Sequence, residues 1–412
     1  IPFLIRELFI YKLVFYFIYM KNIKRKICVT TGTRSEYGLL RPVLTELKKS
    51  KKIDLILIVT GMHLSSKYGN TIDLIKKDGF KISYKFPMIP KKDSSFYMAK
   101  SLGEGIVKFA TIFKKINPDI NVILGDRDES FASAIAAFHM NIPNAHIHGG
   151  DRTMGGIDEY IRHAITKISN IHFAASKVSQ KRIVKMGENK DFVFFTGSPG
   201  IDDIFKQKIS TKNKLKRKYG VDLKGNEILL LQHPVTSQIS QSEKQILSIL
   251  SVISKLKLTT IAIAPNSDAG NMPIFTHLSN YSKKFPFIRV FSSLPRDDYL
   301  GFLKYCGVLV GNSSSGMIEG SYFDTPIVNL GIRQKDREHG NNVINVHTMN
   351  QQNIRKSIMT SLKLNSKKPV IKNTIDSKKE NKSHQLKTET KETKKPVHNN
   401  NDKKPSDQKE KT

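Results

Sequence analysis

Short apolar runs alternate with amphipathic stretches through the middle of the chain. Runs of valine, isoleucine and leucine predict a first series of buried strands at residues 27–31, 55–60, 122–124, 145–147, 171–174 and 192–195. A second series follows at residues 228–231, 260–264, 287–291, 308–310 and 327–330. Helical periodicity between them predicts helices that include residues 39–48, 131–139, 178–186, 244–256 and 298–305. Continuous apolar strands that alternate with helices are typical of parallel sheets covered on both faces.

A polar stretch at residues 209–226, with a lysine run and Gly220, separates the two series of strands. The sequence therefore predicts an α/β protein with two Rossmann-like, doubly wound domains that face each other across a cleft. We expect the first domain at residues 21–205 and the second at residues 206–365. A length of 412 residues fits two to three ordinary domains.

The two ends of the chain differ from this body. Residues 1–20 are an apolar and aromatic extension that Arg6, Glu7 and Lys12 interrupt, so no run approaches the ~20 residues of a membrane helix. We expect translation to start at Met20 and the extension not to be native; the alternative is an interfacial anchor. Residues 366–412 are rich in Lys, Asn, Thr and Ser with almost no large apolar residue, which predicts a disordered, Lys-rich tail.

The charge balance is strongly basic, with 68 Lys and Arg against 36 Asp and Glu, a net charge of +32. This excess favours anionic ligands by long-range steering. A nucleic-acid or membrane-surface binder would need basic and aromatic residues clustered in the body, but the excess is scattered or terminal. We therefore expect neither nucleic acid nor membrane as a partner. Two cysteines exclude a disulfide-dense extracellular module.

Residues suited to an anion follow the first predicted strand. Gly32 permits a tight turn, Ser35 can cap the next helix, and Arg34 lies beside the positive end of that helix. Free N–H groups and a guanidinium group at a helix N-terminus are suited to phosphate. The alternative is an ordinary strand–turn–helix with a surface arginine, because the segment is neither a Walker loop nor a GxGxxG motif.

The next candidates for chemistry follow the predicted strands at 122–124 and 145–147. Asp126 and Arg127 end the former, where a guanidinium group can hold a carboxylate ionised; the alternative is that Asp126 only caps the next helix. Three histidines, three acids and two arginines then occur within residues 146–163, around two glycine pairs. Groups of this kind carry out proton transfer near neutral pH, and we favour catalysis here over a metal site. We expect one of His146 and His148 to be a core histidine.

The second half offers a site for a diphosphate. The segment Gly311-Asn312-Ser313-Ser314-Ser315-Gly316 lies between a strand and a helix, so hydroxyl and backbone N–H groups can hold phosphate oxygens. Glu319, one turn into that helix, could accept hydrogen bonds from ribose hydroxyls. Arg333, Arg337 and His339 add positive charge after the last strand. His233, Asn266 and Asp268 follow two other strands, although turn formers there also fit an ordinary loop.

Taken together, these motifs resemble the UDP-N-acetylglucosamine 2-epimerase family, and most closely its hydrolysing branch, which serves sialic-acid-type sugar biosynthesis. The resemblance covers about residues 26–362. The matching segments are GTRSEYG at 32–38, GDR at 125–127, HIHGGD at 146–151, IDEYIRHAITK at 157–167, TGSPGIDDI at 196–204, QHP at 232–234, PNSDAGN at 265–271, GNSSSGMIEG at 311–320 and NLGIRQ at 329–334.

The resemblance implies a fold of the GT-B type, with the last helix packing on the first domain. It also implies a reaction that eliminates UDP through a glycal and adds water, releasing N-acetylmannosamine or a related 2-acetamido sugar. The alternative is the non-hydrolysing epimerase, which returns a UDP-sugar. A remote alternative is a basic binding protein. The resemblance implies neither a metal nor a redox cofactor, and we expect a cytoplasmic homo-oligomer, a dimer or a tetramer.

The resemblance also assigns roles to individual residues. The catalytic candidates are Asp126, His148, Asp151, Asp158 and His233. The substrate-binding candidates are Arg34, Arg127, Arg162, His163, Asn266, Asp268, Ser313, Ser314, Ser315, Glu319 and Arg333. In this family a glutamate commonly occupies the position of His148. Either Asp151 supplies the missing carboxylate, or His148 itself takes the proton-transfer role.

Overall fold

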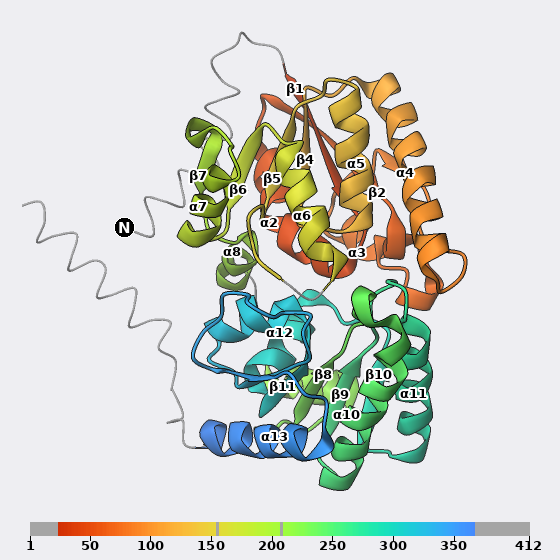
Figure 1. Cartoon of the computed structure of the whole chain (residues 1–412), viewed down its shortest axis with the longest axis vertical. Coiled ribbons are helices and arrows are strands. Elements are labelled where there is room, and N and C mark those ends of the chain that lie inside the picture. The colour runs from red at the N-terminus through yellow and green to blue at the C-terminus, as the bar shows by residue number, and fades with distance from the viewer. Residues whose placement is uncertain (1–23, 154–155, 207–208, 367–412) are drawn as a thin grey trace, which may run out of the picture. The chain divides into compact units, whose positions relative to one another are not determined.

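The computed structural model describes residues 24–153, 156–206 and 209–366, and the predicted N-terminal extension and C-terminal tail lie outside these residues except for residue 366. Two parallel sheets, each with helices on both faces, make up the described chain (Figure 1). The predicted architecture of two doubly wound sheets is confirmed.

The first sheet has the strand order β3-β2-β1-β4-β5-β6-β7. Its strands are β1 (Arg25–Thr31), β2 (Ile53–Val59), β3 (Tyr84–Lys85), β4 (Ile120–Leu124), β5 (Asn144–Ile147), β6 (Ile171–Ala174) and β7 (Val193–Phe195). Its helices are α2 (Arg34–Lys49), α3 (Ile72–Lys77), α4 (Ser95–Ile116), α5 (Asp128–His139), α6 (Ile157–Lys167), α7 (Lys177–Lys185) and α8 (Pro199–Lys206), with short turns η1 (Gly61–Leu64), η2 (Ser66–Tyr68) and η3 (Lys190–Phe192). Leu40 and Leu44 of α2 pack on one face of this sheet, and Phe109 and Phe113 of α4 belong to the core on the other.

The second sheet has the order β10-β9-β8-β11-β12-β13. Its strands are β8 (Ile228–Leu231), β9 (Thr260–Ile263), β10 (Ile288–Phe291), β11 (Val308–Gly311), β12 (Ile327–Leu330) and β13 (Val343–Val346). Its helices are α9 (Lys212–Tyr219), α10 (Ser242–Leu256), α11 (Asn271–Lys284), α12 (Arg296–Tyr305) and α13 (Gln351–Ser366), with short turns η4 (Thr236–Gln241) and η5 (Gly316–Gly320).

Two elements in the second half differ from expectation. The polar stretch after residue 209 contains helix α9, which buries Leu215 against the core that α12 covers. Helix α13 buries Ile354 and Ile358 in the core of the second sheet. The last described helix therefore packs on the second sheet, whereas the resemblance implied packing on the first domain.

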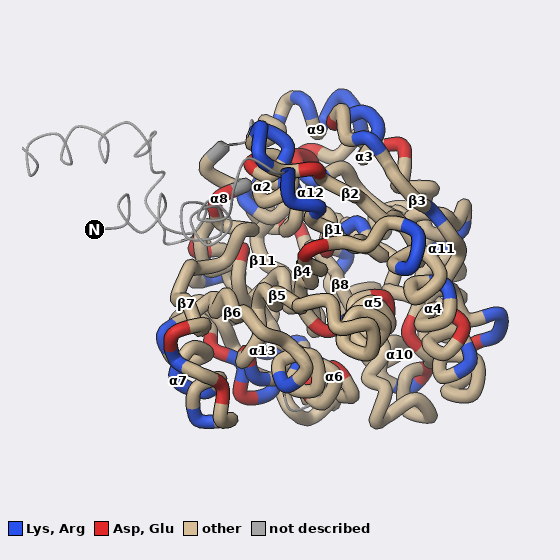
Figure 2. Tube along the Cα trace, turned by 90° about the horizontal axis from the view of Figure 1, so that it is seen from above, with Lys and Arg blue, Asp and Glu red and all other residues tan. Residues whose placement is uncertain are grey.

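Lysine and arginine residues are spread over several elements of the described chain, as Figure 2 shows. Their densest run is on α9, where acidic side chains neutralise part of it through the ion pairs Lys214–Asp297, Lys216–Asp222 and Lys218–Asp298. In the stretches 24–153, 156–206 and 209–366, no helix combines the length and apolarity needed to cross a membrane.

The end of β11 requires a glycine. Gly311 has a φ of 136°, and a Cβ atom there would overlap the carbonyl oxygen of Leu231, a backbone atom that cannot move aside alone. We expect Gly311→Ala to destabilise the protein by at least about 2 kcal/mol, measured by thermal or urea unfolding. Gly103 is the control, because it lies inside α4 and a Cβ atom there would meet nothing within 4 Å. Gly103→Ala should stabilise by about 0.5–1 kcal/mol, and a similar loss in both variants would contradict the steric argument.

Candidate active site

A cavity lies at the carboxyl ends of the strands of both sheets, where open α/β sheets bind their ligands. The first half lines it with residues that follow β1 and β4, on either side of the point where the strand order reverses. The second half lines it with residues that follow β8, β9, β10 and β11. The predicted residues in its wall are Arg34, Asp126, Arg127, His233, Asn266, Ser313, Ser314, Ser315, Glu319 and Arg333.

The N-terminus of α2 presents Arg34 to this cavity. Thr33, not Ser35, is the N-cap: its side chain accepts a hydrogen bond from the backbone N–H of Glu36, and the Glu36 carboxylate accepts one from the N–H of Thr33. The predicted cap was therefore misplaced by two residues, because a capping box also needs the glutamate at its third helical position. Arg34 lies over the ring of Tyr299, 5.9 Å from its centroid, so it bridges the two halves. Burial and the neighbouring Arg296 lower the pKa of Arg34 to about 10.

The serine run after β11 meets a second guanidinium group. Ser315 donates a hydrogen bond to Glu319, and Arg296 forms an ion pair with the same carboxylate. The residues Gly316–Gly320 form a π-helical turn, a rare conformation that is frequent at functional sites. Hydroxyl groups, an arginine and a buried carboxylate therefore surround one end of the cavity, as a nucleotide site requires.

His233 has a defined proton position in this cavity. Its Nδ1 accepts a hydrogen bond from the backbone N–H of Asn266, with N and Nδ1 3.2 Å apart. Burial, together with the positive charge of Arg333, lowers the pKa of His233 to about 3, so the ring is neutral. A neutral ring that accepts at Nδ1 carries its proton on Nε2. His233 is therefore a hydrogen-bond donor toward a ligand rather than a base.

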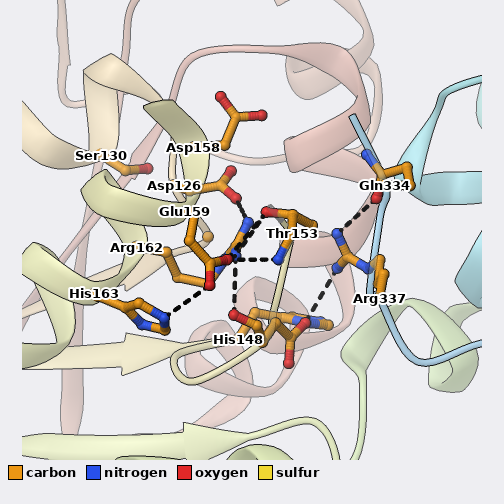
Figure 3. Close-up of polar contacts among 12 residues, drawn as sticks. Asp126, Ser130, His148, Thr153, Asp158, Glu159, Arg162, His163, Gln334 and Arg337 are labelled. Carbon is orange, nitrogen blue, oxygen red and sulfur yellow. Dashed lines mark hydrogen bonds and ion pairs between the residues drawn. The ribbon is translucent and has the colours of Figure 1, made fainter. Parts of the chain in front are cut away.

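Asp126 is held by an arginine from α6. Arg162, whose side chain is 2% exposed, forms an ion pair with Asp126 and also contacts Glu159 and the hydroxyl of Thr153 (Figure 3). Burial alone would raise the pKa of Asp126, but Arg162, with further arginines nearby, holds it below its ordinary value. The Asp126 carboxyl group is therefore ionised at the wall of the cavity.

Two ion pairs join the halves beside the cavity. Arg127 contacts Asp268 at 2.6 Å, and Arg333 contacts Asp158 at 2.8 Å. Burial raises the pKa of Asp158 above its ordinary value despite Arg333, and the nearby carboxylates Asp126 and Asp268 add to the shift. The pKa values of Asp126 and Asp158 are thus shifted in opposite directions, which is the pattern of a general base beside a general acid.

The two histidines of the HIH segment have different surroundings, because β5 ends at Ile147 and the backbone of His148 turns into the left-handed region, with a φ of 66°. His146 is fully buried, with Nε2 2.7 Å from the carbonyl oxygen of Gly125, and burial lowers its pKa to about 3. It is the core histidine. His148 lies beyond the strand, with Nδ1 3.0 Å from Asp151, so the imidazole and the carboxylate are in direct contact.

Six predicted residues are not among the described residues that line this cavity: His148, Asp151, Asp158, Arg162, His163 and Asp268. Arg162, Asp158 and Asp268 contact residues in its wall, through the ion pairs described above. His163 is one contact further away, with Nε2 3.1 Å from Glu159. Direct contact of His163 with substrate stays a prediction that this geometry does not favour.

Several residues of the site were missed by sequence reasoning. Arg296, Tyr299, Ser292 and Ser293 line the cavity after β10, at the end of a predicted strand where the same rule would have found them. Asp93 accepts hydrogen bonds from the N–H groups of Gly270 and Met272 at 2.6 and 2.9 Å, so a first-half carboxylate caps helix α11 of the second half. No signal in the sequence indicates this long-range contact. Within the described stretches, no group of three or more His, Cys, Asp or Glu is placed to hold a metal ion.

A buried carboxyl group in the wall of the cavity makes stability depend on pH. Burial and the neighbouring Glu129 raise the pKa of Glu36 to about 7, against an ordinary 4.5. Because the folded state holds this proton more tightly, the contribution of Glu36 to stability is present below about pH 4.5 and is lost as the pH rises through about 7. We expect Glu36→Gln to lose less thermal stability than the wild type between about pH 5 and 8. The exposed Glu104→Gln is the control, and parallel pH curves for Glu36→Gln and wild type would refute the assignment.

Comparison with known proteins adds to this geometry. The family model described as UDP-N-acetylglucosamine 2-epimerase matches residues 45–381. A Legionella pneumophila protein named UDP-N,N'-diacetylbacillosamine 2-epimerase (hydrolyzing) is 40% identical over 348 residues, which cover 84% of this chain and 90% of that protein. The polysialic acid biosynthesis protein P7 of Escherichia coli is 38% identical over 324 residues, covering 78% of this chain and 82% of that protein.

The fold is likewise similar to solved structures. The crystal structure of the Neisseria meningitidis UDP-GlcNAc 2-epimerase bound to UDP-GlcNAc has a TM-score of 0.68 and 19% identity. The match covers 88% of this chain and 100% of that one. The predicted GT-B fold and the predicted family are both confirmed, since a matching family model that spans most of the chain joins two relatives above 30% identity. The chain belongs to the UDP-N-acetylglucosamine 2-epimerase family, within its hydrolysing branch.

Proposed function

We propose that this protein eliminates UDP from a UDP-linked 2-acetamido sugar and adds water to the glycal, releasing the free sugar inverted at C2. The observation that carries the proposal is the opposite displacement of the pKa values of Asp126 and Asp158 beside one cavity. Inversion at C2 needs a group that removes a proton from one face and another that returns a proton to the other face. A carboxyl group that is held ionised and a second one whose pKa is raised suit these two tasks.

The diphosphate fits the end of the cavity that the second half builds. Ser313, Ser314 and Arg333 supply donors there, and Arg34 approaches from the first half. These groups, with the Nε2–H of His233, would stabilise the charge that develops on departing UDP. Glu319 is placed for the ribose hydroxyls, and Arg296 and Ser315 orient its carboxylate.

Binding of the diphosphate would also prepare the acid. In the structure Arg333 is paired with Asp158. A phosphate group that takes over the Arg333 guanidinium group leaves the buried Asp158 without its cation, and burial then favours the protonated form. Asp126 keeps Arg162 as its partner and remains the ionised base.

The relatives favour water rather than UDP as the group that adds to the glycal. Two of the named relatives carry the word hydrolyzing, and a Campylobacter jejuni relative, 35% identical, is named for GDP- and UDP-N,N'-diacetylbacillosamine. The sugar is therefore either N-acetylglucosamine or N,N'-diacetylbacillosamine, and both belong in the assay. A homo-oligomeric state and a cytoplasmic location stay predictions.

The products decide between the two branches of the family. We expect the purified protein to convert one of these UDP-sugars to UDP and a free C2-inverted sugar, which NMR detects directly. In deuterated water the product should carry deuterium at C2, since the returned proton comes from an exchangeable group. A C2-inverted sugar still linked to UDP would instead identify the non-hydrolysing reaction, and no turnover of either UDP-sugar would contradict the proposal.

Two substitutions separate nucleotide binding from proton transfer. Ser314→Ala should weaken UDP binding by about 1–2 kcal/mol in calorimetry, the cost of one charge-assisted hydrogen bond. Asp126→Asn should bind UDP normally but stop turnover, because the amide is isosteric and has no basicity. Thermal unfolding of both variants checks that they are folded. Unchanged UDP affinity in Ser314→Ala would remove the nucleotide from the serine run, and near-normal turnover in Asp126→Asn would remove Asp126 from the mechanism.

A further inference from the structure

Four polar side chains form an uninterrupted chain of contacts beside the cavity. Arg337 Nη2 lies 3.1 Å from Asp151 Oδ2, Asp151 Oδ2 lies 3.0 Å from His148 Nδ1, and His148 Nε2 lies 3.0 Å from Ser198 Oγ. Arg337 follows β12 in the second half, whereas the other three residues belong to the first half. The array is therefore complete only when the two halves are together.

Asp151 is an acceptor on every side. Ser179 donates to its other oxygen, with Oγ and Oδ1 2.8 Å apart. Arg337, which donates to Asp151, also donates to Gln334 Oε1 at 3.2 Å (Figure 3). Burial alone would raise the pKa of Asp151, but His148 and Arg337 hold it far below its ordinary value, so the carboxylate is ionised. An ionised carboxylate can only accept, so Nδ1 of His148 carries a proton and Nε2 presents its lone pair to Ser198 in the neutral ring.

The backbone at His148 is strained to reach this arrangement. Its φ is 66°, in the left-handed region that a non-glycine residue adopts only at a cost. Such strain persists where the surrounding structure requires it, and it clusters at functional sites. Here it places the imidazole between Asp151 and Ser198.

Ser198 connects this array to the substrate cavity. It immediately precedes α8, and its Oγ lies 3.6 Å from the position that a Cβ atom would take at Gly200. Glu319 Oε1, in the cavity wall, is 3.6 Å from the same position. Leu39 Cδ2, also in the cavity wall, overlaps this position, so Ser198 lies beside two residues of the wall, Leu39 and Glu319.

We propose that Ser198 and His148 activate the water that adds to the glycal, and that Asp151 and Arg337 are positioning residues that fix the imidazole for this step. The inference rests on the proposed hydrolysing function. The water oxygen bonds to C1 while its proton passes to Ser198 Oγ, and the Ser198 proton passes to His148 Nε2. C2 takes its proton from Asp158, so the glycal double bond becomes a single bond. The imidazolium then returns its proton to solvent.

The inference separates the two steps of the reaction, because Ser198, His148 and Asp151 take no part in the elimination of UDP. Arg337 also lowers the pKa of Asp126, so Ser198→Ala is the more specific variant. In Arg337→Gln and Ser198→Ala, formation of the free sugar should fall about 100-fold, the usual scale for a lost general base. Release of UDP should fall much less, and the glycal should accumulate. NMR measures glycal, UDP and free sugar in one sample. Arg337→Lys should restore part of the hydration rate, since a cation beside Asp151 is retained.

Two other arginines serve as controls. Arg25→Gln removes an arginine–aspartate contact of the same 3.1 Å length, with Asp119. This pair lies where β1 and β4 begin, at the opposite end of both strands from the cavity, so the variant should change neither product ratio nor rate. Arg333→Gln, four residues before Arg337, should weaken UDP binding, whereas Arg337→Gln should not. Thermal unfolding shows whether each variant is folded, and the downfield proton of His148 Nδ1 in NMR reports the contact with Asp151.

The outcomes distinguish this inference from the function on which it rests. If the wild type releases no free sugar from either UDP-sugar, the proposed function fails. If the wild type is active and folded Arg337→Gln and Ser198→Ala show wild-type ratios of free sugar to glycal, the relay is wrong. An equal loss of UDP release and hydration in both variants would also overturn it, because the array would then serve elimination or structure instead.

Discussion

Charges buried between the two halves must be paired, and this requirement shapes the whole site. Arg127 contacts Asp268, Arg333 contacts Asp158, and Arg337 contacts Asp151, so three guanidinium–carboxylate pairs cross from one half to the other. An unpaired charge in such a place costs several kcal/mol, so the halves cannot separate without water reaching these groups. The contact between the two halves and the charge balance of the site therefore depend on the same three ion pairs.

The same pairs explain how one set of residues can serve both an empty and an occupied site. A diphosphate carries the negative charge that the arginines otherwise obtain from aspartates, so ligand binding exchanges one partner for another rather than burying new charge. Asp126 keeps Arg162 from its own half, whereas Asp158 depends on Arg333 from the other half. On the proposed function, that difference would keep Asp126 ionised and allow Asp158 to gain a proton when the nucleotide binds.

The sequence predicted most of the sheets and the position of the cavity, because continuous apolar strands and the polar residues at their ends are local signals. We also expected one of His146 and His148 to be a core residue; both side chains are buried, and they differ because His148 lies beyond the end of β5. Strands β3 and β13 were missed, since both lie at sheet edges and β3 has only two residues. Helix α4 was missed although its 22 residues include buried Phe109 and Phe113.

The unpredicted contacts of the site come from distant segments: Asp93 and Gly270 are 177 positions apart, and Arg337 and Asp151 are 186 apart. No local pattern records such a contact, because it depends on how the two sheets meet.

The histidine at position 148 makes sense only with its neighbours. A carboxylate can act as a base with either oxygen, but a neutral imidazole has one donor and one acceptor nitrogen, and only one tautomer places the acceptor nitrogen toward Ser198. His148 therefore needs an acceptor on one side and a hydroxyl on the other, which Asp151 and Ser198 supply at 3.0 Å each. Asp151 in turn needs charge compensation, which Arg337 brings from the other half. Replacing a carboxylate by an imidazole at this position thus requires matched residues on three separate segments of the chain.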